Sequence, residues 1–153
     1  MEEQILNLLS GFIGIIIGFI SSALLLRYNY HQLFATTVSS NRMDWINVWR
    51  QNLSKFISCA EIIHTTLETQ DNKEKLLEYK KEMLEARAMI ITRLNTKELN
   101  HVLIYGLLTK LDCSPSNSNF YSQQVEIIEL AHKILKLEWE RVKSEAKGKK
   151  NNG

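Results

Sequence analysis

An uncharged apolar run near the N-terminus constrains this chain more than any other feature. It covers residues 5–26, which read ILNLLSGFIGIIIGFISSALLL. A helix of that length rises about 33 Å, and the hydrocarbon core of a bilayer is about 30 Å thick. The competing interpretation is a cleaved signal peptide, but such peptides begin with basic residues, whereas this run follows Met-Glu-Glu-Gln. The sequence therefore predicts an uncleaved transmembrane helix, with the lipid bilayer as its first partner.

The distribution of basic residues predicts the orientation of that helix. No Lys or Arg precedes the run, whereas Arg27, Arg42 and Arg50 follow it. Because basic flanks remain on the cytoplasmic side, we expect residues 1–4 outside and the rest of the chain in the cytoplasm. The sequence thus predicts a single-pass protein of the cell inner (cytoplasmic) membrane.

Small and polar residues recur every three or four positions in this run, which places them along one side of a helix. Such residues allow membrane helices to pack closely, so they predict self-association or packing against a partner's helix. Glycine and serine are also common in membrane helices, so chance is an alternative. A pore is a further alternative, although no charged ring is present to set ion selectivity. The residues are Asn7, Ser10, Gly11, Gly14, Gly18, Ser21 and Ser22.

A second periodic pattern follows the apolar run. Apolar residues alternate at spacings of three and four, which is the heptad seam of a coiled coil. We expect this seam to associate with other cytoplasmic helices, including those of a second copy. Its members are Ile46, Trp49, Leu53, Phe56, Ala60, Ile63 and Leu67.

The remaining sequence predicts further helices over residues 73–94, 97–111 and 120–146, with the clearest loop at 112–119. No segment has the two-residue alternation of a half-buried strand. The predicted fold is all-α, with one N-terminal transmembrane helix followed by a cytoplasmic antiparallel helical bundle whose first helix is long. Its parts are a short extracytoplasmic N-terminus (1–4), the membrane helix (5–26), a connector (27–41), the bundle (42–146) and a basic disordered tail (147–153).

The residues that carry chemistry in proteins form no recognisable catalytic motif. The two cysteines, Cys59 and Cys113, are not arranged as Cys-x-x-Cys, and no histidine has zinc-ligand spacing. Glu98 and His101 lie one helical turn apart, but a general base needs a nucleophile or substrate that the sequence does not identify. We therefore expect His101 to cap or pack, and we predict no catalytic, cofactor-binding or metal-binding residue. The basic tail suits solvent or lipid headgroups better than nucleic acid.

Three stretches together resemble a known group of proteins. They read SNRMDWI and WRQNLS within residues 40–54, LNTKELNH at 94–101, and ILKLEWERVK at 134–143. They are similar to small bacterial single-pass membrane proteins of unassigned function that carry a cytoplasmic helical domain, some of them encoded near phage-defence genes. The resemblance implies a membrane-tethered defence component. No functional residue is transferred, because that group has no assigned activity.

These patterns predict a non-enzymatic, self-associating helical effector or scaffold that acts by oligomerisation and by perturbing the membrane. One alternative is an accessory subunit whose anchor packs against a larger membrane protein or whose helices dock a cytoplasmic one. A second alternative is a small homo-oligomeric ion channel.

Overall fold

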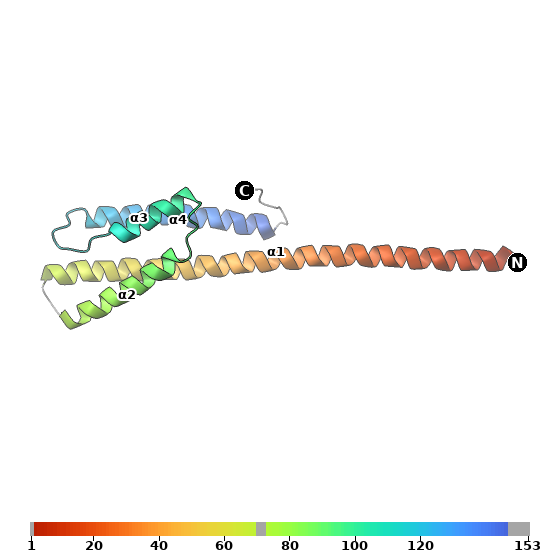
Figure 1. The fold of residues 1–153 in the computed structure, drawn as a ribbon, viewed down its shortest axis with the longest axis horizontal. Coiled ribbons are helices and arrows are strands. Elements are labelled where there is room, and N and C mark those ends of the chain that lie inside the picture. Colours follow the sequence, from red (N-terminus) through yellow and green to blue (C-terminus); the bar gives the residue numbers. More distant parts are fainter. Residues whose placement is uncertain (1, 70–72, 147–153) are drawn as a thin grey trace. The chain divides into compact units, whose positions relative to one another are not determined.

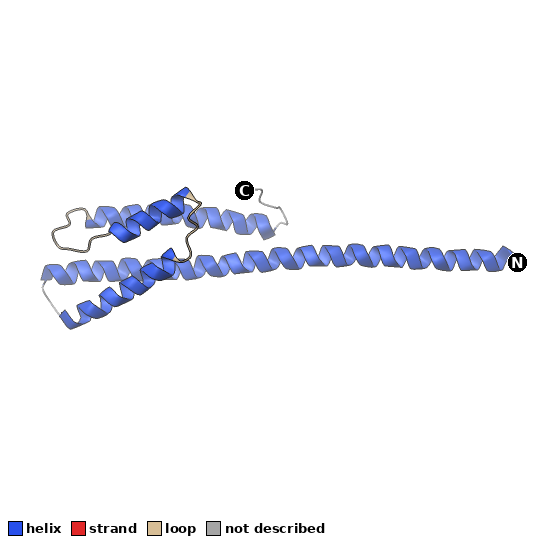
Figure 2. Cartoon of the chain, in the orientation of Figure 1, coloured by secondary structure: helices blue, strands red, loops and turns tan. Residues whose placement is uncertain are grey.

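The computed structural model describes residues 2–69 and 73–146, and over these ranges it contains four helices and no strand (Figures 1 and 2). The helices are α1 (Glu2–Thr69), α2 (Lys73–Ile91), α3 (Leu99–Lys110) and α4 (Phe120–Ala146). The all-α prediction is confirmed, as is the long apolar N-terminal helix. The predicted basic tail, 147–153, lies outside the described residues.

Within the described residues, α1 is the one helix long and apolar enough to cross a membrane, judged by length and composition. Its apolar window is not buried anywhere in the structure. Every side chain from Leu9 to Tyr30 is exposed. No part of residues 2–69 or 73–146 therefore covers this segment.

The chain divides into two compact units. Among the described residues, one holds 2–40 with 143–146, and the other lies within 41–142 and is called here the helical unit. The helical unit contains the C-terminal part of α1, all of α2 and α3, and most of α4.

All four helices contribute to the core of the helical unit. Side chains three or four positions apart point to one side of each helix, and these sides meet. Their buried members are Trp49, Leu53 and Phe56 from α1, Ala86 and Ile90 from α2, Ile104 and Leu108 from α3, and Ile127, Ala131 and Ile134 from α4. A second cluster joins Ala60 and Ile63 to Cys113 and Phe120, with Leu76 and Tyr79 of α2 against it. Figure 1 shows α2 running back beside the C-terminal part of α1.

The heptad seam of α1 lies in this core. Ile46, Trp49, Leu53, Phe56, Ala60 and Ile63 are all buried, and Leu67 packs half-buried against the second cluster. In the described residues the seam packs against α2, α3 and α4 of the same chain, and its association with a second copy stays a prediction. Packing within one chain is enough to explain the heptad pattern.

The connections between helices match the expected loops closely. The loop 112–119 is confirmed, and the Asp112 carboxylate organises its start by accepting hydrogen bonds from the backbone N–H and the hydroxyl of Ser114. α2 was expected to reach residue 94, but it ends at Ile91. The chain leaves the helix through tighter turns, in which Arg93 N–H donates to the Ile90 carbonyl and Leu94 N–H to that of Ile91.

Candidate functional site

The row of small residues in α1 faces open space. Ser10, Gly11, Gly14, Gly18, Ser21 and Ser22 are all exposed, whereas the side chain of Asn7 lies outside the described part. A Cβ added at Gly11, Gly14 or Gly18 would meet nothing within 4 Å. Packing within the described chain therefore gives no reason for glycine at these positions.

Large apolar side chains cover most of the remaining surface of the same segment. All are exposed, so no single stripe faces a protein core as it does in an amphipathic helix. A surface of this kind needs lipid or protein around it. The residues are Leu9, Phe12, Ile13, Ile15, Ile16, Ile17, Phe19, Ile20, Leu24, Leu25 and Leu26.

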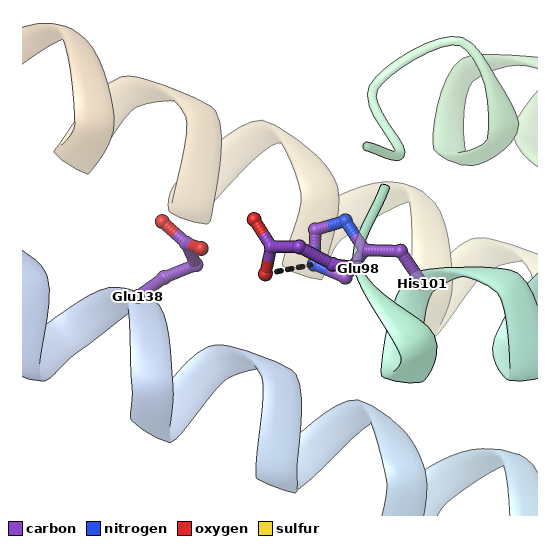
Figure 3. Close-up of side chains that lie close together, drawn as sticks. All are labelled: Glu98, His101 and Glu138. Carbon is purple, nitrogen blue, oxygen red and sulfur yellow. Dashed lines mark ion pairs between the residues drawn. The ribbon is translucent and has the colours of Figure 1, made fainter. Parts of the chain in front are cut away.

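The helical unit holds one cluster of groups that could ligate a metal, among the residues that the structure describes. Figure 3 shows Glu98 just before α3, His101 within α3 and Glu138 on α4. One ligand atom of each lies within 4.8 Å of the others. The sequence brought Glu98 and His101 together by helical spacing but missed Glu138, because helical periodicity gives no information on which helices become neighbours.

Two arginines occupy both carboxylates of this cluster. Arg42 Nη1 donates to Glu138 Oε2 at 2.5 Å. Arg141 Nη1 and Nη2 each donate to one carboxylate oxygen of Glu98, at 3.0 Å. Arg141 Nη1 also pairs with Oε1 of Glu138. Glu138 is only 4% exposed, so these contacts replace the water that its charge would otherwise require. Two guanidinium groups thus balance two carboxylates.

The ion pairs shift the pKa values of Glu98 and Arg141. Hydrogen bonds from Arg141 lower the pKa of Glu98 below its ordinary value of 4.5, against the opposing effect of burial, and the Asn95 side chain lowers it further. The same pairing with Glu98 raises the pKa of Arg141. Both groups are therefore held in their charged forms at neutral pH.

His101 is buried and fixed on both sides. Its ring stacks on Trp45, with centroids 6.2 Å apart and planes 9° apart. The backbone N–H of Asn95 donates to its Nδ1 at 2.8 Å, so Nδ1 must carry a lone pair and the ring proton sits on Nε2. Nε2 lies 4.0 Å from Glu98 Oε2, beyond hydrogen-bond length. His101 therefore ties the turn before α3 to the core, which is the capping and packing role expected from its position.

This geometry suits an ion-pair cluster that joins α1, α3 and α4. A metal ion at its centre would have to displace the guanidinium groups from Glu98 and Glu138 and would find only Nε2 of His101, since Nδ1 is engaged. A general base needs a carboxylate or imidazole that faces a substrate, and these carboxylates face arginines.

The cysteines lie apart from this cluster. Burial raises the pKa of the Cys59 thiol, and the nearby Glu82 carboxylate adds to the effect. Burial likewise raises the pKa of Cys113, whose sulfur lies 3.9 Å from that of Met83. A raised pKa disfavours the thiolate, which is the nucleophilic form of cysteine.

Comparison of the chain with protein-family models, with curated proteins and with solved structures found no match.

Proposed function

We propose that this chain is a non-enzymatic, single-pass inner-membrane protein that acts as a helical effector or scaffold through self-association. In this proposal the first part of α1 crosses the bilayer, and the helical unit is a cytoplasmic antiparallel bundle. One observation carries the proposal: the apolar part of α1 is exposed on every side.

The energy of that exposure supports the membrane location. Enclosing one large aliphatic or aromatic side chain is worth about 1.5–3 kcal/mol. Residues 9–26 present many such side chains and no charged one. Water is therefore a poor environment for the segment, and lipid surrounds it without any help from the rest of the chain.

The orientation follows from charge. The first basic residue, Arg27, comes directly after the apolar segment. By the positive-inside rule this flank lies on the cytoplasmic side, which places the helical unit in the cytoplasm and residues 1–4 outside.

The row from Ser10 to Ser22 supports contact between membrane helices. Lipid tails make few contacts with glycine or serine. A second helix, in contrast, can bring its backbone close to that of α1 over Gly14 and Gly18. Both glycines have open space where a Cβ would be. The resemblance to bacterial membrane proteins encoded near phage-defence genes supports a defence role, in which oligomers disturb the membrane.

A second candidate, an accessory subunit, rests on the same open row. A larger membrane protein with a small-residue helix of its own would fit there as well as a second copy does. An ion channel has less support, because the seam expected to build a cytoplasmic oligomer lies inside the chain.

The test uses two differently tagged full-length copies, co-expressed and extracted in mild detergent. We expect the wild-type copies to co-purify and Gly14→Ile with Gly18→Ile to reduce co-purification about tenfold, a change of about 1.4 kcal/mol, because the added side chains keep the two backbones apart. The control, Ile16→Phe with Ala23→Ile, adds bulk on the opposite side of α1 and should keep the wild-type level. Wild-type copies that never co-purify would overturn self-association.

A further inference from the structure

α3 is apolar on two opposite sides, and the helical unit covers only one of them. His101, Ile104 and Leu108 face the core and are buried. On the other side, Leu99 is 73% exposed and Val102 and Leu103 are each about half exposed. An apolar side of a helix is normally covered by protein or lipid. The outer side of α3 therefore has the character of an interface.

The exposed side of α3 borders a groove. The groove lies between α3 and α4 and has a volume of about 380 Å³. Val102, Leu103 and Gly106 line it from α3, and Leu130 lines it from α4. Together with Leu99, these positions give a continuous apolar strip at the spacing that another helix would contact.

Gly106 lies in the middle of α3, where glycine is unfavourable. Glycine costs about 0.5–1 kcal/mol relative to alanine in a helix interior. Nevertheless a Cβ at Gly106 would meet nothing within 4 Å. Close packing within the described chain does not require this glycine. A second helix lying over the groove would explain the glycine, because without a side chain at Gly106 the two backbones can approach closely.

The charges around the groove indicate what occupies it. Lys110 and Lys133 stand at its rim with Glu126 and Glu129, and all four are exposed. Among the described residues, none of the four makes an ion pair. A rim with two charges of each sign suits a partner that carries the same rim, because a two-fold axis crossing the middle of the groove can bring lysines of one copy opposite glutamates of the other.

We propose that this surface, formed by Leu99, Val102, Leu103 and Gly106 and the four rim charges, is a contact between two copies of the chain. The proposal rests on the proposed function, because copies held in one bilayer meet at high effective concentration. A contact smaller than the roughly 800 Å² per partner of a stable soluble dimer is then sufficient.

The test exchanges the charges of the rim in the full-length protein. An acidic variant carries Lys110→Glu and Lys133→Glu, and a basic variant carries Glu126→Lys and Glu129→Lys. Each is tested against itself, and the two are then tested against each other, by co-purification of tagged copies from mild detergent. The control, Lys75→Glu with Lys80→Glu, changes exposed charges on α2.

We expect each variant alone to associate at least about tenfold more weakly than wild type, because like charges face each other across the pair. The acidic and basic variants together should return to near the wild-type level, which also shows that both are folded. The control should match wild type. Self-association of either variant at the wild-type level, or a mixture that stays as weak as the separate variants, overturns the proposal.

These outcomes separate the inference from the proposed function. If only the substitutions at Gly14 and Gly18 reduce association, the membrane helices meet and the α3 surface does not. If only the rim variants reduce it, the α3 surface is the contact and the membrane row is not. Wild-type copies that fail to co-purify overturn both.

Discussion

At the scale of single residues, Glu138 shows what a buried charge requires of its neighbours. It is almost fully buried, whereas its partners Arg42 and Arg141 each keep about a third of their side chains exposed. The arginines can turn toward water when the pair is broken, but the carboxylate cannot. The cost of breaking the cluster therefore depends on which partner is removed.

We expect Arg141→Met to lower the free energy of unfolding by about 3–5 kcal/mol, because it leaves Glu138 short of a cation and Glu98 without its two-point contact. Glu138→Gln, which keeps the shape and removes the charge, should cost about 1–2 kcal/mol. Arg50→Met, at an exposed position on α1, is the control and should change stability by no more than about 0.5 kcal/mol. Urea unfolding in detergent measures all three, and equal losses at Arg141 and Glu138 would contradict this account.

Glu98 makes stability depend on pH in a defined direction. Arg141 holds its native pKa below the ordinary value of 4.5, so the unfolded chain takes up the proton first as the pH falls. The stabilisation is complete at neutral pH, begins to decline near pH 4.5 and is lost as the pH falls through the native pKa. We expect the wild type to lose more stability than Glu98→Gln on acidification from about pH 7 to about pH 3. Glu78→Gln, at an exposed position on α2, should follow the wild type; a Glu98→Gln curve parallel to wild type would disprove the assignment.

At the scale of helices, periodicity predicted which side of α1 is buried but not what buries it. The same spacing of three and four serves a coiled coil between chains and a helix packed within one chain. The end of α2 was also missed, because Thr92, Arg93 and Leu94 are all acceptable in a helix. The turn they form depends on Asn95, whose backbone is held by the distant ring of His101.

A substitution at Phe56 tests whether the heptad seam of α1 packs within one chain or between two chains. It is 1% exposed and contacts the main core cluster. We expect Phe56→Ala to lower the free energy of unfolding by about 3–5 kcal/mol through the cavity it leaves. The loss should not vary with protein concentration, because the covering helices belong to the same chain. Ser54→Ala, nearby on the exposed side, should have little effect; a concentration-dependent loss at Phe56 would restore the seam to an interface between chains.

At the scale of the whole molecule, the sequence was sufficient for the class of fold and for the apolar helix, since both depend on composition and on local spacing. It was not sufficient for the ion-pair cluster. Arg42 and Glu138 are 96 positions apart, and Glu98 and Arg141 are 43 apart. Their meeting depends on how α1, α3 and α4 pack, and no local pattern encodes that.

The proposal that the apolar part of α1 crosses the bilayer is tested on the full-length protein. We expect the full-length protein to remain with the bilayer after alkaline extraction, because an apolar helix that spans lipid is held by its side chains and not by charge. Ile16→Lys with Ile17→Lys places two cations near the centre of the apolar segment at a cost of about 2.5–3.5 kcal/mol each, and it should move much of the protein to the soluble fraction. Leu77→Lys with Leu84→Lys adds the same charges at exposed positions on α2 and should leave the protein in the membrane.

Orientation is read from the same preparations. Protease added to inside-out vesicles should digest the helical unit, and protease added to intact spheroplasts should leave it whole, because the proposed orientation, which rests on Arg27 and the basic residues after it, puts this side in the cytoplasm. Replacing Arg27 with Glu should weaken that preference without inverting it, since Arg42, Arg50 and Lys55 remain on the same side. Digestion from outside the spheroplast would place the helical unit on the opposite side of the membrane. The apolar helix would then stand as an anchor, but the cytoplasmic scaffold would not.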